Sequence, residues 1–213
     1  MKIIVFGARG DVGSRIVVEA LRRGHQVTAA VRSSAQSTAA LAGVETVVAD
    51  ASDTAAVADL IKEYDLAISA VRPPDGKESD LVPLTASILS AAARTGTRIL
   101  IVGGAASLRL PDAPIHTVLT APNFLPEPVV PIARASFAQY ETAMAEVQAD
   151  WTYVSPPAML VPGERTGQYR VGGDTLLVDG KGQSQISMED FSVALLDEAE
   201  NPHHRQARFT VAN

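Results

Sequence analysis

Three glycines near the N-terminus have the spacing of a phosphate-binding turn. Gly7, Gly10 and Gly13 follow the apolar stretch 3–6 and precede an amphipathic stretch. In such a turn the first glycine permits the bend, the second lets the backbone approach a pyrophosphate, and the third lets the helix pack on the strand. An ordinary strand-to-helix turn is the alternative, but the flanking pattern favours a dinucleotide site. The residues expected to contact the cofactor here are Gly7, Arg9, Gly10, Asp11, Val12 and Gly13.

The end of the second predicted strand indicates which dinucleotide binds. Proteins that bind NAD usually carry an acidic residue there, which accepts hydrogen bonds from the ribose 2′-OH, whereas a basic residue accommodates a 2′-phosphate. No acidic residue occurs between Val27 and Thr38, and the strand is followed by Arg32 and Ser33. We therefore expect NADP(H) to be preferred over NAD(H), with Arg9 as a second donor to the phosphate. A solvated surface position for Arg32 is the alternative.

Small and polar residues follow the other predicted strands. Ligands of parallel sheets bind outside the carboxyl ends of the strands, so these residues are expected beside the cofactor. Asp50 is expected to address the adenine. Its alternative role is to cap the following helix, for which Ser52 or Asp53 is better placed. The remaining residues expected at this edge are Ala51, Ser69, Ala70, Val71, Gly103 and Gly104.

Tyr140 is the side chain best suited to act as an acid or base. Many dehydrogenases carry a lysine four residues after such a tyrosine, where its charge lowers the tyrosine pKa. This chain has Met144 at that position, so alcohol dehydrogenation through a tyrosinate is disfavoured. Flavins and quinones accept a hydride and can take the proton from water. We therefore predict an NADPH-dependent oxidoreductase that reduces a flavin, a quinone or a similar small conjugated acceptor.

Alternating apolar and amphipathic stretches position these residues. Continuous apolar runs are typical of buried parallel strands, and the longer stretches between them are typical of covering helices. The pattern predicts an α/β fold with a Rossmann-like, doubly wound, mostly parallel sheet, helices on both faces and a small C-terminal extension on the substrate side. The predicted strands are 2–7, 26–31, 44–49, 66–71, 98–103, 151–155 and 207–211, with shorter pieces at 168–171 and 175–179. The predicted helices are 12–23, 53–63, 80–95, 134–149 and 188–199.

Two segments depart from this alternation. Residues 111–133 contain six prolines, which predicts a long ordered loop or lid, and 156–213 form the extension. We expect one NAD(P)-binding domain over 1–213, with its core in 1–110 and 134–155. His116 is the histidine we would test for substrate binding, because binding residues are often found on such loops.

Motifs along most of the chain support this interpretation. The chain resembles the atypical short-chain dehydrogenases known as NADH-flavin reductases in five segments: the glycine run, 23–32, 103–108, 151–157 and 162–167. These reductases are relatives of flavin reductase/biliverdin reductase B and of the NmrA-like proteins. The family name says NADH, whereas the basic residue after the second strand favours NADPH.

The resemblance implies roles around the acceptor. Ser107 would donate a hydrogen bond to the acceptor, Pro156 would fix the face of the nicotinamide ring, and Arg165 with Tyr169 would line the pocket. Ser107 could instead cap a loop or helix, Pro156 could simply end its strand, and Arg165 could form a surface ion pair. The residues expected at the acceptor are Ser107 and Tyr140 as catalytic groups, and His116, Pro157 and Arg165 as binding groups.

Composition limits the other functions. Eighteen basic and twenty-four acidic residues give a net charge of −6, which disfavours nucleic acid as a partner. The chain has no cysteine, no metal-ligand spacing, no signal-peptide pattern and no apolar run long enough for a membrane span. We expect a soluble cytoplasmic protein with a small-molecule acceptor, no metal and no membrane contact, and we consider a homodimer.

Two other functions suit the same sequence. An NmrA-like redox sensor would bind NADP(H) without catalysis and pass the redox state to a protein partner. A sugar-nucleotide epimerase or dehydratase also suits the fold, although it normally needs the missing lysine and a larger C-terminal domain.

Overall fold

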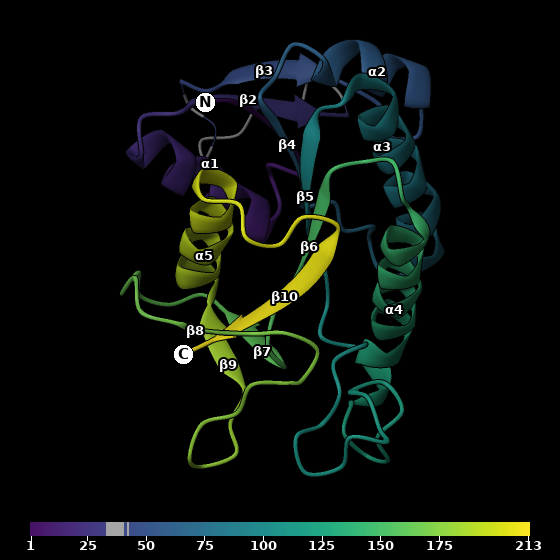
Figure 1. Cartoon of the computed structure of the whole chain (residues 1–213), viewed down its shortest axis with the longest axis vertical. Helices are drawn as coiled ribbons and strands as arrows, with labels where there is room; N and C mark the ends of the chain where they lie inside the picture. The colour runs from purple at the N-terminus through teal and green to yellow at the C-terminus, as the bar shows by residue number, and fades with distance from the viewer. Residues whose placement is uncertain (33–40, 42) are drawn as a thin grey trace.

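A mostly parallel eight-stranded sheet lies at the centre of the molecule (Figure 1). The computed structural model describes residues 1–32, 41 and 43–213, and the strand order is β3-β2-β1-β4-β5-β6-β10-β8. The described pairs are parallel except that β8 runs antiparallel to β10. The strands are β1 (Lys2–Phe6), β2 (Gln26–Val31), β3 (Glu45–Val48), β4 (Leu66–Ser69), β5 (Arg98–Val102), β6 (Trp151–Ser155), β8 (Arg170–Gly172) and β10 (Ala207–Ala212).

Helices cover both faces of this sheet (Figure 1). Helices α1 (Asp11–Arg22) and α5 (Met188–Glu200) pack together on one face, and α2 (Thr54–Ile61), α3 (Leu81–Thr95) and α4 (Val130–Ala145) cover the other. Each face has its own apolar core, since strand side chains alternate between faces. Ile3 and Val5 point into the α1–α5 core, and Ile4 and Phe6 into the core beneath the other three helices.

The predicted α/β fold is confirmed, and the differences are local. Residues 175–179 form no strand, and only an isolated bridge joins Thr175 to Arg109. The sequence pattern missed β7 (Met159–Val161) and β9 (Gln185–Ser187), which pair with each other outside the main sheet. Three-residue strands are too short to show the period that identifies longer ones.

Helix α4 begins four residues earlier than predicted, inside the proline-rich segment. Pro131 lies in its first turn, where the missing N–H of proline costs no helical hydrogen bond. The helix ends at Ala145 rather than at residue 149, because the Glu146 carboxylate accepts hydrogen bonds from the N–H groups of Gln148 and Ala149. A three-residue 3₁₀ turn (Glu127–Val129) precedes α4, and another (Glu78–Asp80) precedes α3.

The proline-rich segment packs against the C-terminal extension through a small third core. Leu108 and Val118 are buried against Leu176 of the extension. Backbone hydrogen bonds join Arg109 N–H to the Asp174 carbonyl at 2.9 Å and Leu176 N–H to the Arg109 carbonyl at 2.8 Å. This part of the chain is therefore held against residues 174–176 of the extension, and the proline-rich segment lies at the lower end of the view in Figure 1.

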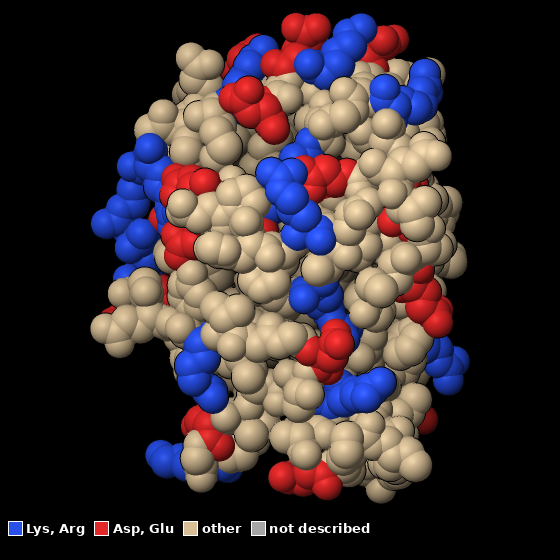
Figure 2. Space-filling model, in the orientation of Figure 1, with Lys and Arg blue, Asp and Glu red and all other residues tan. Residues whose placement is uncertain are grey.

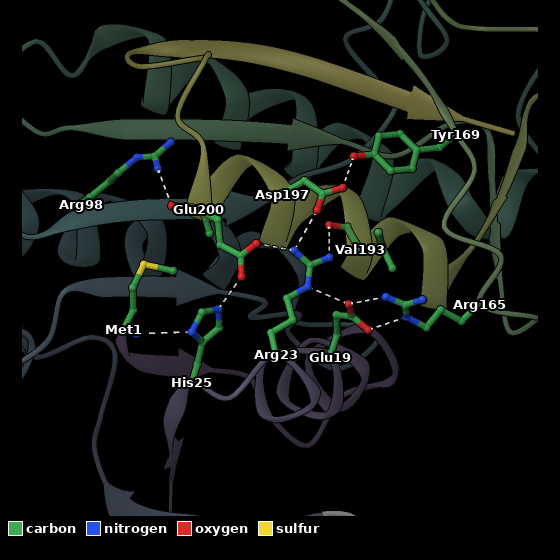
Figure 3. Close-up of polar contacts among 11 residues, drawn as sticks. Met1, Glu19, Arg23, His25, Arg98, Arg165, Tyr169, Val193, Asp197 and Glu200 are labelled. Atoms are coloured by element: carbon green, nitrogen blue, oxygen red, sulfur yellow. Dashed lines mark hydrogen bonds and ion pairs between the residues drawn. The ribbon is translucent and has the colours of Figure 1, made fainter.

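An ion-pair network joins α1 to α5 and to the loop after β7 (Figure 3). Glu19, whose side chain is 5% exposed, accepts hydrogen bonds from Arg23 at 2.8 Å and from Arg165 at 2.7 and 2.8 Å. Arg23 also reaches Asp197 and Glu200 of α5, both at 2.8 Å. The hydrogen bond from Arg165 and the contact with Arg23 lower the pKa of Glu19 to about 2.

Replacement Glu19→Gln should destabilise the protein by roughly 2–4 kcal/mol, because it leaves two partly buried guanidinium groups without their shared carboxylate. Urea unfolding at pH 7 measures the change. Since the pKa of Glu19 is lowered from 4.5 to about 2 on folding, its contribution is complete above pH 4.5 and declines as the pH falls toward 2. The difference between the two proteins should therefore shrink with falling pH. Glu141→Gln, at an exposed site on α4, is the control; an equal loss in both variants would contradict the argument.

Candidate functional site

Two adjoining cavities lie along the carboxyl ends of the central strands. The first, of about 750 Å³, is lined by the glycine loop and by the residues after β2, β3 and β4. The second, of about 850 Å³, is lined by the residues after β4, β5 and β6, by the proline-rich segment and by α4. They share Gly10 and residues 70–74, so one elongated ligand can span both. The junction lies where the strand order reverses beside β1, the usual ligand position in such sheets.

The glycine loop has the shape that its three glycines impose. Gly7 has a φ of +76°, and a Cβ there would lie 2.3 Å from the Ala70 carbonyl oxygen. A Cβ on Gly13 would lie 2.1 Å from the Gly7 carbonyl oxygen, so helix and strand approach too closely for any side chain. At Gly10 the nearest atom to such a Cβ is 3.4 Å away. The first and third glycines are thus required by the fold, whereas the second faces the cavities and leaves space for a ligand.

The start of α1 fits a pyrophosphate. Its N-cap residue, Gly10, provides no side chain to satisfy the first N–H groups of the helix. Those groups have no partner within the helix, and they lie at the positive end of its dipole. Asp11 and Val12 from this turn line the larger cavity beside Gly10. The site therefore fits a dinucleotide: an anion-binding turn lies between two cavities of suitable size.

Residues that the sequence pattern did not identify shape the larger cavity. A Cβ on Gly103 would lie 2.1 Å from the ring of Tyr153, and one on Gly104 would lie 2.5 Å from the Ser136 hydroxyl. The fully buried Tyr153 hydroxyl accepts a hydrogen bond from the Gly104 N–H at 3.2 Å, and it lies 3.1 Å from the Gln139 side-chain carbonyl. Tyr153 belongs to the 151–157 motif, but its role becomes visible only when α4 packs on β6.

The rest of this cavity is mainly apolar. Pro156 and Pro157 line it as expected, and the described ionisable groups in its lining are Asp11, Arg72 and Asp75. Arg72 and Asp75 are exposed, with side chains 67% and 93% accessible, and they pair with each other at 3.6 Å. The inner apolar walls come from the following residues: Leu81, Val102, Ala105, Ala106, Val118, Leu125, Val129, Ile132 and Ala133.

Comparison with known proteins decides the family. A family model described as NAD(P)H-binding matches residues 7–202. The chain belongs to the NAD(P)H-binding family. The uncharacterised protein YwnB of Bacillus subtilis (strain 168) is 34% identical over 215 residues, spanning 100% of this chain and 99% of YwnB.

Solved structures of similar proteins share the whole fold. A proposed exported protein from Burkholderia pseudomallei is 36% identical, with a TM-score of 0.89 and 100% of each chain covered. A proposed epimerase from Bacteroides thetaiotaomicron is 36% identical, with a TM-score of 0.87 and 99% and 96% coverage. SP1627 of Streptococcus pneumoniae, a proposed NADH-flavin reductase, is 32% identical, with a TM-score of 0.81 and 100% and 99% coverage. The resemblance seen in the sequence motifs is thereby confirmed.

No helix in the described part of this NAD(P)H-binding protein combines the length and the apolar character that crossing a bilayer requires. Basic and acidic side chains are interspersed on the face that Figure 2 shows. The cytoplasmic location, the homodimer and the absence of a nucleic-acid partner stay predictions.

The smaller cavity carries the groups expected at the adenosine end of the cofactor. Arg9, Arg32, Asp50 and Ala51 line it, and Ser33 lies outside the described residues. The Asp50 carboxylate accepts hydrogen bonds from the N–H and hydroxyl of Ser52, which lower its pKa, and nearby Arg32 lowers it further. Helix α2 is capped instead by Asp53. Asp50 is therefore a turn residue whose carboxylate stays ionised beside Arg32, and adenine contact is a prediction.

The two residues expected to act as catalytic groups lie outside the cavity lining. Ser107 is 7% exposed, and its hydroxyl accepts a hydrogen bond from Arg208 at 2.6 Å. The Arg208 guanidinium also lies 4.1 Å from the centre of the Tyr140 ring. Burial raises the Tyr140 pKa, and Met144 of the same helix is 50% exposed. Both residues pack around Arg208, and the expected hydrogen bond from Ser107 to the acceptor and the catalytic role of Tyr140 stay predictions.

Three residues expected at the acceptor lie outside the lining of the described cavities. Arg165 pairs with Glu19 on the α1 side, and Tyr169 donates a hydrogen bond to Asp197 (Figure 3). His116 lies in the proline-rich segment, where its carbonyl accepts from the Leu110 N–H at 3.0 Å, but it lines none of the described cavities. Pro157, which was also predicted to bind the acceptor, does line the larger cavity. Ser69 is buried behind the lining, whereas Ala70 and Val71 belong to both cavities.

Replacing the second and third glycines should separate cofactor binding from stability. Gly10→Ala should keep the free energy of unfolding within about 1 kcal/mol but weaken dinucleotide binding at least tenfold, because its methyl group enters the ligand space. Gly13→Ala should destabilise by roughly 2 kcal/mol or more, since its Cβ meets the Gly7 carbonyl. Urea unfolding without ligand and titration with NADPH measure the two effects. Equal stability losses in both variants would contradict the assignment.

Replacement Arg32→Asp should lower the preference for NADPH over NADH by about ten- to a hundredfold, since a charge-assisted hydrogen bond to the 2′-phosphate contributes roughly 1.5–3 kcal/mol. Fluorescence titration with both reduced cofactors measures the ratio. Arg22→Asp makes the same charge change at the exposed end of α1 and should leave the ratio unchanged. An unaltered ratio in Arg32→Asp would show that the phosphate binds elsewhere.

Proposed function

We propose that this NAD(P)H-binding protein is an oxidoreductase that uses NADPH to reduce a small conjugated acceptor, such as a flavin or a quinone. The observation that carries the proposal is the larger cavity, which adjoins the dinucleotide turn and has apolar inner walls. Its described ionisable groups lie at the solvent-exposed rim or in the glycine loop. Such a cavity suits a flat, uncharged ring more than a polar sugar.

The chain's contribution to the reaction is positioning. When bound, the dinucleotide supplies a hydride. Gly10 and the first turn of α1 would hold its pyrophosphate, and Arg32 and Arg9 its 2′-phosphate. Pro156 and Gly103 would border the nicotinamide end, so that an acceptor ring between α4 and Pro157 lies against it. Proximity and orientation of this kind contribute several kcal/mol to lowering a barrier.

Proton transfer is not assigned to a side chain. Of the two tyrosines near the cavity, Tyr140 and Tyr153, both have raised pKa values because of burial, so neither supplies a tyrosinate. A reduced flavin or quinone can take its proton from water at the open rim. This argues against the epimerase chemistry suggested by the name of the Bacteroides relative, since that chemistry needs a base near the substrate.

The name of the Streptococcus pneumoniae relative supports the flavin alternative, and Arg32 supports NADPH as the donor. An anaerobilin reductase from Escherichia coli O157:H7 is 20% identical and shares the fold, with a TM-score of 0.75. An NmrA-like sensor would need the dinucleotide site alone. The roomy apolar cavity beside that site favours an enzyme.

Purified protein should oxidise NADPH in the presence of riboflavin, FMN or a benzoquinone, measured by the loss of nicotinamide absorbance. Tyr140→Phe should retain at least about half of kcat, because the phenol performs no proton transfer in this scheme, whereas loss of a general acid or base usually costs 10²–10⁴-fold. Gly10→Ala is the variant expected to lose turnover through its cofactor affinity. Tight NADPH binding without turnover of any acceptor would overturn the proposal and favour the sensor.

A further inference from the structure

A third cavity, of about 430 Å³, lies beside the larger cavity. We call it the side cavity. Ala158 and Met159 line both, so the two cavities adjoin at the start of β7 and the residue before it. The shared residue Met159 is 54% exposed. The other lining residues are Leu110, Pro111, Asp112, Ala113, Phe124, Leu176, Val178, Gly182, Gln183, Ser184 and Gln185.

Main-chain hydrogen bonds hold the walls of the side cavity in place. One wall is the proline-rich segment, tied to the extension by the bridges of Arg109 described above. The floor is fixed because the Ala158 N–H donates to the Ser184 hydroxyl at 3.1 Å and the Met159 N–H donates to the Ser184 carbonyl at 2.9 Å. The opposite wall is a turn in which Asp179 accepts from the N–H groups of Lys181 and Gln183, both at 2.8 Å. A preformed cavity loses little entropy on binding.

The chemistry of the side cavity selects against anions. Among the described lining residues none is Lys or Arg, and the one ionisable group is the carboxylate of Asp112. The remaining walls are mostly apolar, with Phe124, Leu176 and Val178 facing the same space. Figure 1 shows the proline-rich segment and the 179–184 turn projecting from the lower end of the molecule, and both contribute lining residues to the side cavity.

We propose that the side cavity binds an uncharged, apolar side chain of the acceptor whose ring lies in the larger cavity. The preferred substrate class is then a quinone with an alkyl or isoprenoid chain, and phosphorylated chains are disfavoured. This inference rests on the proposed function. In the reaction, a quinone takes a hydride from NADPH and one proton from water, which gives the hydroquinone and NADP⁺.

Steady-state kinetics with two benzoquinones, alike except that one carries a hexyl chain, tests the proposal. The chain should lower KM at least about tenfold, because each buried methylene adds favourable transfer free energy. Ala113→Trp fills the side cavity. It should raise the KM for the hexyl quinone to the KM of the quinone without a chain, and it should leave the KM of the quinone without a chain unchanged. Ile115→Trp is the matched control, because Ile115 is 88% exposed on the same loop and does not line the cavity.

Two further variants keep the test decisive. Gln183→Trp fills the same cavity from the opposite wall, so that a folding defect in one variant does not decide the result. Asp112→Lys should lower the KM for FMN relative to the KM for riboflavin, because FMN carries a phosphate that riboflavin lacks and the new lysine would attract it. Equal KM values for the two quinones, or an equal rise for both in Ala113→Trp and Gln183→Trp, would overturn the side-cavity proposal while leaving the reductase intact. No turnover of either quinone, with riboflavin or FMN still reduced, would overturn the side-cavity proposal alone, whereas no turnover of any acceptor would overturn both.

Discussion

The close approach of α1 to β1 is the constraint on which the rest of the site depends. It exists because position 13 has no Cβ: the space that a Cβ would occupy lies 2.1 Å from the Gly7 carbonyl oxygen. Once helix and strand meet at this distance, the first N–H groups of α1 point across the carboxyl end of β1. Strands β2 and β4 flank β1, and the residues that follow them become the two sides of one crevice. The anion-binding turn thus follows from a packing requirement.

A buried cation organises the other half of the site. Arg208 of β10 donates to Ser107 and to Asp174 and lies against the Tyr140 ring, so it joins the loop after β5, the extension and α4. A guanidinium removed from water costs several kcal/mol unless its donors are paired, which makes this arrangement specific in geometry. Ser107 and Tyr140, which the sequence suggests for catalysis, both contact this guanidinium. These polar groups lie behind the lining of the larger cavity and hold the segments that form its walls.

The sequence predicted the parts of the molecule that follow from local chemistry. Long apolar strands, amphipathic helices and the glycine run each depend on neighbours within a few residues, and these were confirmed. The contacts of Ser107 and Arg165 could not be predicted, because their partners are far away in the chain: Ser107 bonds to a residue 101 positions later, and Arg165 to one 146 positions earlier. Likewise, Tyr153 shows its importance only against Gly103 and Gly104. Tertiary packing assigns those roles, and no periodic pattern records it.

The same packing holds the two tyrosine side chains that lie near the larger cavity. The buried Tyr153 hydroxyl is paired with the Gly104 N–H, the Ser136 carbonyl and the Gln139 side-chain carbonyl, so its polar atom is satisfied within the protein. Tyr140 lies against a guanidinium through its ring, and burial favours its neutral phenol. Behind the lining, the ring of Tyr153 packs against Gly103, so that glycine backbone forms this part of the cavity wall. This arrangement suits the proposed reaction, in which an acceptor ring stacks against the hydride donor and takes its proton from water.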